Sequence, residues 1–133
     1  MAEKRIEISF ERGGKFVVTL LTDKAPKTCE AVLKKLPIEE TIYQATTAGQ
    51  ELFFKGGLGA GFPIENAIKP AAGYVGYAAD QEWQNLLIYY GDFIVFPKYF
   101  TIFGKVTENL PELLEVGRRV WLKGVEKVTV KAI

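Results

Sequence analysis

The 133-residue sequence contains no histidine and only one cysteine, and these two scarcities exclude several kinds of chemistry. Without histidine there is no Ser-His-Asp or Cys-His catalytic arrangement, no imidazole general base, and no zinc site that depends on imidazole. We therefore expect no metal and no other cofactor. The single thiol, Cys29, cannot form a disulfide within the chain, which favours an intracellular, cytoplasmic location.

The sequence also contains few arginines and has a net charge close to zero. Arginine occurs only at positions 5, 12, 118 and 119, so nothing from Gly13 to Gly117 carries a guanidinium. The net charge is +1, and no basic run is interleaved with aromatic residues, so neither nucleic acid nor a membrane is expected as a partner. No apolar run reaches the length of a signal peptide or a membrane span. The length suits one domain, residues 1–133.

Most of the sequence consists of short segments in which apolar and polar residues alternate, as they do in β-strands. Ile6, Ile8 and Phe10 share one face of a strand, and the glycines of the turn at 11–14 connect it to a second strand, rich in β-branched residues. Residues typical of turns separate the other segments that we expect to form strands. The expected strands are 6–10, 15–21, 41–47, 51–54, 74–78, 86–90, 99–107, 118–122 and 127–133.

Two segments have a helical period instead. From Pro26 to Leu36, apolar residues recur with helical spacing, and one of them is Cys29, which we interpret as a core residue. Asp23 is a candidate cap for this helix. A second, short helix is expected from Pro111 to Val116, ended by Gly117. The pattern is therefore mostly β with two short helices, which is typical of a barrel or sandwich.

Two stretches resemble cyclophilins. The segment 21–28, Leu-Thr-Asp-Lys-Ala-Pro-Lys-Thr, is similar to their strand-to-helix segment, and Phe103-Gly-Lys-Val106 is similar to the strand before their second helix. Over nearly its full length the chain resembles small bacterial and archaeal proteins of cyclophilin-like fold and no assigned activity. The shared features are residues 23–29 and a strand that ends in an aromatic residue and glycine, here 88–91. The resemblance implies a cyclophilin-like closed β-barrel.

The central strands depart from the cyclophilin pattern. Where cyclophilins carry Phe-His-Arg and then Gln-Gly-Gly on the active face, this chain has Ile42-Tyr-Gln-Ala45 and Gln50-Glu-Leu-Phe53. The favoured function is therefore a module that binds a small molecule or peptide, with little or no catalysis. A divergent prolyl isomerase is one alternative. A hydrolase or isomerase of small molecules that uses Glu51, Glu65 or Asp80 as its acid or base is another.

The expected binding pocket lies beside the barrel, on the strands that correspond to the cyclophilin active face. Its aromatic walls and polar contacts are Tyr43, Glu51, Phe53, Asn66, Tyr77 and Tyr90. Simple strand alternation favours a solvated, outward Glu51, whereas a binding role requires it beside the rings with a raised pKa. The glycine-rich loop from Lys55 to Gly73 is expected to be mobile and to close over the ligand.

The aromatic residues between Ile88 and Phe100 exceed what one side of a barrel readily buries. We therefore also expect a homo-oligomer, with a dimer as the simplest form.

Prolyl isomerase activity is predicted to be very low or absent. A cyclophilin directs its arginine at the twisted amide, and loss of such a charged donor typically lowers the rate by about 10²–10³-fold. Neither Lys55 nor Lys98 reproduces a planar guanidinium. A protease-coupled assay on a proline peptide measures this rate, and catalysis within tenfold of an ordinary cyclophilin would contradict the prediction.

Overall fold

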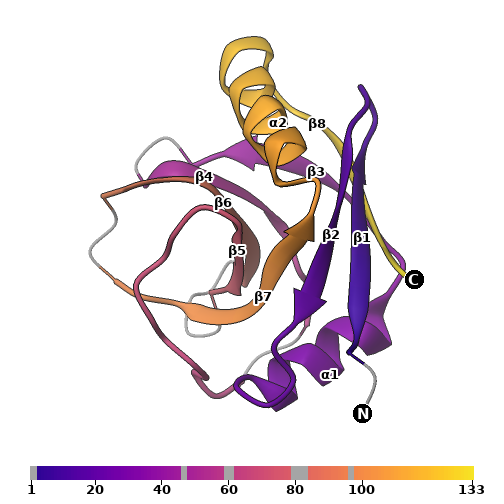
Figure 1. The fold of residues 1–133 in the computed structure, drawn as a ribbon, viewed down its shortest axis with the longest axis vertical. Coiled ribbons are helices and arrows are strands. Elements are labelled where there is room, and N and C mark those ends of the chain that lie inside the picture. The colour runs from indigo at the N-terminus through magenta and orange to yellow at the C-terminus, as the bar shows by residue number, and fades with distance from the viewer. Residues whose placement is uncertain (1–2, 46–47, 59–61, 79–83, 96–97) are drawn as a thin grey trace.

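A closed antiparallel barrel forms the body of the molecule (Figure 1). The computed structural model describes residues 3–45, 48–58, 62–78, 84–95 and 98–133. In the described residues the strand order is β1-β2-β7-β5-β6-β4-β3-β8, and β8 pairs back onto β1. The strands are β1 (Arg5–Phe10), β2 (Lys15–Leu20), β3 (Ile38–Gln44), β4 (Gly49–Lys55), β5 (Tyr74–Tyr77), β6 (Asn85–Ile94), β7 (Thr101–Glu108) and β8 (Glu126–Ala132). The predicted closed barrel with two helices is confirmed.

Strand alternation fills the barrel with side chains. Ile6 and Ile8 of β1 and Phe16 and Val18 of β2 are buried, as the period-two pattern predicts. A second, smaller apolar cluster lies on the other face of the β4-β6-β5-β7 sheet and includes Leu87, with Tyr89, Phe100 and Ile102. This part of the sheet therefore carries apolar side chains on both faces, and its two faces offer different environments.

Helix α1 (Pro26–Lys35) packs against one end of the barrel. Cys29 is buried, its thiol donates to the Phe103 carbonyl at 3.4 Å, and burial raises its pKa to about 12. The interpretation of Cys29 as a core residue is confirmed. Asp23 does not cap the helix. The Glu65 carboxylate does so from the distant loop, since it accepts hydrogen bonds from the backbone N–H groups of Lys27 and Thr28.

Helix α2 (Leu110–Lys123) lies at the opposite end of the barrel and is much longer than predicted. It absorbs the whole segment 118–122, so the expected strand there is wrong. Gly117 does not end the helix; it lies in the middle, where the ring of Tyr90 packs against its backbone. A Cβ at Gly117 would overlap ring atoms of Tyr90. Glycine is therefore required here by close approach and not by a helix end.

A buried ion-pair cluster fastens the C-terminal half of α2 to the barrel. The Glu126 carboxylate is almost fully enclosed, and Arg119 binds it through two hydrogen bonds of 2.8 and 2.6 Å. Arg12 approaches the same carboxylate at 3.2 Å. Burial alone would raise the pKa of Glu126, but the hydrogen bonds and positive charges of the two arginines hold it below its ordinary value.

Among the described residues, neither helix has both the length and the apolar character that a membrane crossing requires.

Because Gly117 packs against Tyr90, we expect the substitution Gly117→Ala to change the stability of the protein in the direction opposite to that usual for a helix. In an open helix interior, Gly→Ala stabilises by about 1 kcal/mol. We expect Gly117→Ala to destabilise the protein by roughly 1–3 kcal/mol instead, because the new methyl group overlaps the Tyr90 ring. Urea unfolding measures the change, with Glu115→Ala on the exposed face of the same helix as a neutral control. A stabilised Gly117→Ala protein would contradict this packing.

Candidate functional site

The six residues predicted to form one pocket lie on different sides of the sheet. Register pairs Glu51 with Tyr89 and Phe53 with Leu87, and places all four on the outer face of the barrel wall. Tyr77 and Tyr90 belong to the barrel interior. The predicted common pocket is therefore not formed with that lining, because neighbouring residues of one strand point to opposite faces. Whether these side chains bind a ligand stays a prediction.

Tyr43 and Phe53 do lie together, on the outer face. Their strands pair at this position, and their rings stack with centroids 5.3 Å apart. Tyr43 remains 43% exposed. This pair is a solvent-facing aromatic surface rather than the wall of an enclosed cavity.

Glu51 is the most unusual side chain of the outer face. It is only 5% exposed, so the solvated position favoured by strand alternation is wrong, although the side chain does point outward from the barrel. The Tyr89 hydroxyl hydrogen-bonds to the carboxylate, but Oε1 has no hydrogen-bond partner among the described residues. Burial is the main cause that raises the pKa of Glu51 to about 7, and the Tyr89 hydrogen bond opposes that rise.

The described part of the loop from Lys55 to Gly73 is fastened at several points. Besides the cap that Glu65 provides for α1, the Asn66 amide donates to the Ile102 carbonyl at 2.9 Å. The backbone N–H of Ala72 donates to Asp92 at 2.8 Å. Glu65 and Asn66 therefore hold the loop against α1 and β7, and their predicted roles toward a ligand stay predictions. Asp80, the third candidate acid or base, lies outside the described residues.

Tyr90 forms the floor of an apolar groove beside α2. Its hydroxyl donates to Gln44 Oε1 at 2.6 Å, and its ring lies under Gly117. The groove has a volume of about 500 Å³, within the range of small-molecule sites. Its lining residues are Gly49, Gln50, Tyr90, Phe93, Val95, Arg118, Trp121 and Leu122.

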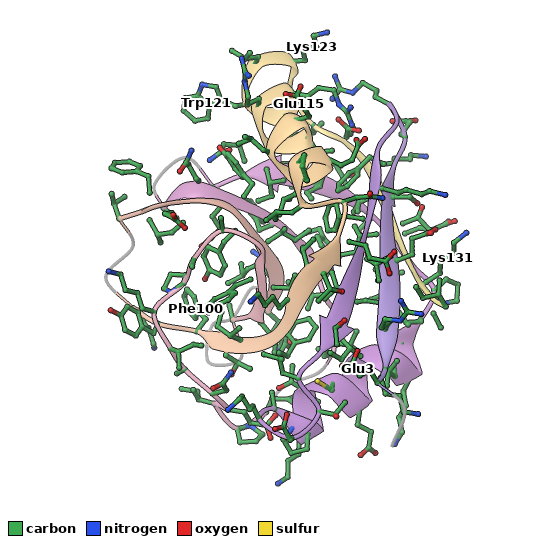
Figure 2. The ribbon with its side chains drawn as sticks, viewed as in Figure 1. Glu3, Phe100, Glu115, Trp121, Lys123 and Lys131 are labelled. Atoms are coloured by element: carbon green, nitrogen blue, oxygen red, sulfur yellow. The ribbon has the colours of Figure 1, made fainter. Side chains whose placement is uncertain are left out.

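The walls of this α2 groove are apolar side chains left open to solvent. Phe93 is 66% exposed and Trp121 is 58% exposed, although both are large hydrophobic residues. Trp121 projects from α2 on the side away from the β1–β2 hairpin (Figure 2). A cavity of about 620 Å³ beside α1 is larger, but Lys27, Glu30 and Lys34 form much of its rim. The α2 groove is thus the better match to an organic ligand.

Sequence reasoning found Tyr90 but missed the other side of the groove. The sequence pattern predicts a strand at 118–122, whereas in the structure Arg118, Trp121 and Leu122 lie on α2 and line the groove together with Tyr90. A signal was present, since the spacing of Leu113, Val116 and Val120 continues the helical stripe past Gly117. The glycine in the middle of that stripe obscured it.

The exposed aromatic residues also bear on self-association. Phe93 and Tyr99, both within the segment expected to be over-rich in aromatics, are 66% and 48% exposed. Trp83 and Phe96 lie outside the described residues. Dimerisation stays a prediction.

Comparisons with known proteins agree with the barrel. A family model described as "Protein of unknown function (DUF3830)" matches residues 8–96. No curated protein matches the chain. Among solved structures, McbB in complex with tryptophan superposes with a TM-score of 0.79 and 22% identity, over 95% of this chain and 44% of McbB. The present chain therefore spans less than half the length of that protein.

Two further structures match over almost their whole length. The hypothetical protein AF2241 from Archaeoglobus fulgidus has a TM-score of 0.71 and 22% identity, covering 98% of this chain and 95% of its own. A cyclophilin-type peptidyl-prolyl cis-trans isomerase from Cryptosporidium parvum has a TM-score of 0.69 and 16% identity, covering 99% and 98%. At these identities the similarity shows the fold alone. The predicted cyclophilin-like fold is confirmed.

The buried carboxylate predicts a pH-dependent stability. The pKa of Glu51 is about 7 in the folded protein and 4.5 ordinarily, so the unfolded chain loses its proton first as pH rises. Stability should therefore fall between about pH 4.5 and pH 7, by roughly 3 kcal/mol in total. We expect Glu51→Gln to remove this fall, as measured by urea unfolding across that range.

Glu30→Gln is the matched control, because Glu30 is a fully exposed carboxylate on α1. It should leave the decline from pH 4.5 to pH 7 in place. A Glu51→Gln protein whose stability declines as steeply as that of the wild type would show that the Glu51 carboxylate is solvated.

Proposed function

The chain belongs to the DUF3830 family of proteins of unknown function, and from that premise we propose that it is a binding protein that holds a small molecule or the end of a peptide in the α2 groove. The observation that carries the proposal is the exposure of two large apolar side chains, Phe93 of β6 and Trp121 of α2, that line the same groove. Exposed large apolar side chains gathered around a groove mark a binding site more often than scattered ones do.

The construction of the groove supports a preformed site. Its floor is fixed, because Tyr90 is held by Gln44 below and by Gly117 above. One edge is fixed as well, because Gln50 Oε1 accepts a hydrogen bond from the Phe93 backbone at 3.0 Å. The Gln50 side chain lies against Gly91, where a Cβ would overlap it. A ligand therefore meets a floor and one edge that are already fixed, which lowers the entropy lost on binding.

Binding fits the described residues better than acid–base catalysis does. Glu65 is committed to the α1 cap, and Glu51 lies on the opposite face of the sheet from Tyr90. Among the described residues, the polar side chains of the groove are those of Gln50, Tyr90 and Arg118, and none of them is a carboxylate or an imidazole. One structural neighbour, McbB, was determined in complex with tryptophan, an aromatic amino acid, and this is consistent with a small-molecule role for such a barrel.

A fluorescent apolar anion, 1-anilinonaphthalene-8-sulfonate, tests the groove directly. We expect the dye to bind the folded protein and to brighten as water is excluded. Trp121→Ala should weaken binding by about tenfold or more, because it removes one wall and much of the apolar contact area. Tyr43→Ala is the control, since it removes an exposed aromatic residue from the outer face.

Each variant is first checked for an unchanged melting curve, because loosened proteins also bind this dye. Equal affinity in the wild type and in Trp121→Ala would reject the groove as the binding site. A loss of affinity in Tyr43→Ala alone would move the site to the outer aromatic surface.

A further inference from the structure

The polar side chains that line the α2 groove offer hydrogen-bond donors. Gln50 has its Oε1 engaged by the Phe93 backbone N–H, which leaves the amide NH₂ as its open group. Arg118 carries only donors. The Tyr90 hydroxyl gives its proton to Gln44 inside the barrel. A ligand that satisfies this lining must therefore bring acceptors.

Arg118 is the least neutralised arginine of the chain. Arg5 pairs with Glu108 at 2.8 Å, and both Arg12 and Arg119 bind Glu126. Among the described residues, the ion-pair partner of Arg118 is Glu115 at 3.9 Å, and both side chains are more than half exposed. An ion pair of this length in water contributes little, so an incoming anion can displace it.

Among the described residues that line the groove, Arg118 is also the only charged one, and Phe93, Val95, Trp121 and Leu122 supply apolar surface beside it. The site thus combines aromatic and aliphatic surface with one exposed and weakly paired guanidinium. A ligand with a positive charge would be repelled, and a wholly apolar one would leave both donors without acceptors.

We propose that the α2 groove selects a small apolar carboxylate, whose aromatic or branched aliphatic group lies between Phe93 and Trp121 and whose carboxylate binds Arg118 and the Gln50 amide. This inference rests on the proposed binding function and names its ligand class. A free carboxylic acid and the C-terminus of a peptide with an apolar last residue share this chemistry.

The test compares three probes of one shape: 3-phenylpropionate, 3-phenylpropionamide and 3-phenylpropylammonium. Quenching of Trp121 fluorescence reports binding, in a Trp83→Phe background that removes the only other tryptophan. We expect the anion to bind at least tenfold more tightly than the neutral amide, as a charge-assisted contact to a guanidinium provides, and the ammonium to bind most weakly.

Arg118→Gln should reduce the preference for anion over amide to about one, whereas Lys123→Gln should leave it unchanged. The control removes the same unit of charge from the same end of α2 without touching the groove lining. Arg118→Lys should keep part of the preference, since it retains the charge and loses the planar fork.

The possible failures are distinguishable. If the anion and the amide bind equally to the wild type, the carboxylate assignment is wrong while the binding function survives. If Arg118→Gln keeps the full preference, another cation is responsible. If no probe quenches Trp121 and the dye does not bind, the proposed function itself fails. A short peptide with a C-terminal phenylalanine, tested as its acid and its amide, separates the two sources of carboxylate.

Discussion

The close approach of the Tyr90 ring to the backbone of Gly117 determines how α2 rests on the barrel. Only glycine, which has no Cβ, allows the backbone of α2 to pack directly against the aromatic ring at that point. The contact fixes the height of the helix, and the binding of Glu126 by Arg119 and Arg12 fixes its C-terminal half. The groove follows from this placement, because Tyr90 becomes its floor and the next turn of α2 supplies Trp121 and Leu122 as its wall.

Glu126 and Glu51 are both buried carboxylates, but burial has opposite outcomes for their pKa values. Glu126 is enclosed together with two guanidiniums and remains ionised. Glu51 is enclosed with one tyrosine hydroxyl, and burial raises its pKa towards neutrality. The distribution of arginine explains the difference, since both partners of Glu126 come from the ends of the chain and the long segment between Gly13 and Gly117 has no guanidinium to offer. The burial of Glu51 therefore lowers the free energy of unfolding by an amount that depends on pH.

The fold was predictable from local patterns because its strands alternate regularly and its first helix has an unbroken apolar stripe. Ile6 and Ile8 are buried where period two places them, and Cys29 is buried where period 3.6 places it. The full length of the second helix was not predictable, because Gly117 is required by its packing against Tyr90, and a single sequence does not reveal such a tertiary contact. Part of the candidate site was hidden for the same reason. Tyr89 and Tyr90 are adjacent in the chain, yet one belongs to the outer cluster and the other to the groove.

The register of the first and last strands has a consequence for longer polypeptides. Ile6 pairs with Ala132, whereas the Phe10 end of β1 leads to the turn that meets α2. The start of β1 and the end of β8 therefore lie side by side, away from α2 (Figure 1). The 44% coverage of McbB shows that a barrel of this kind also occurs within a larger chain. Within a longer chain, the polypeptide would enter β1 and leave β8 at the edge where Ile6 pairs with Ala132, which lies away from α2.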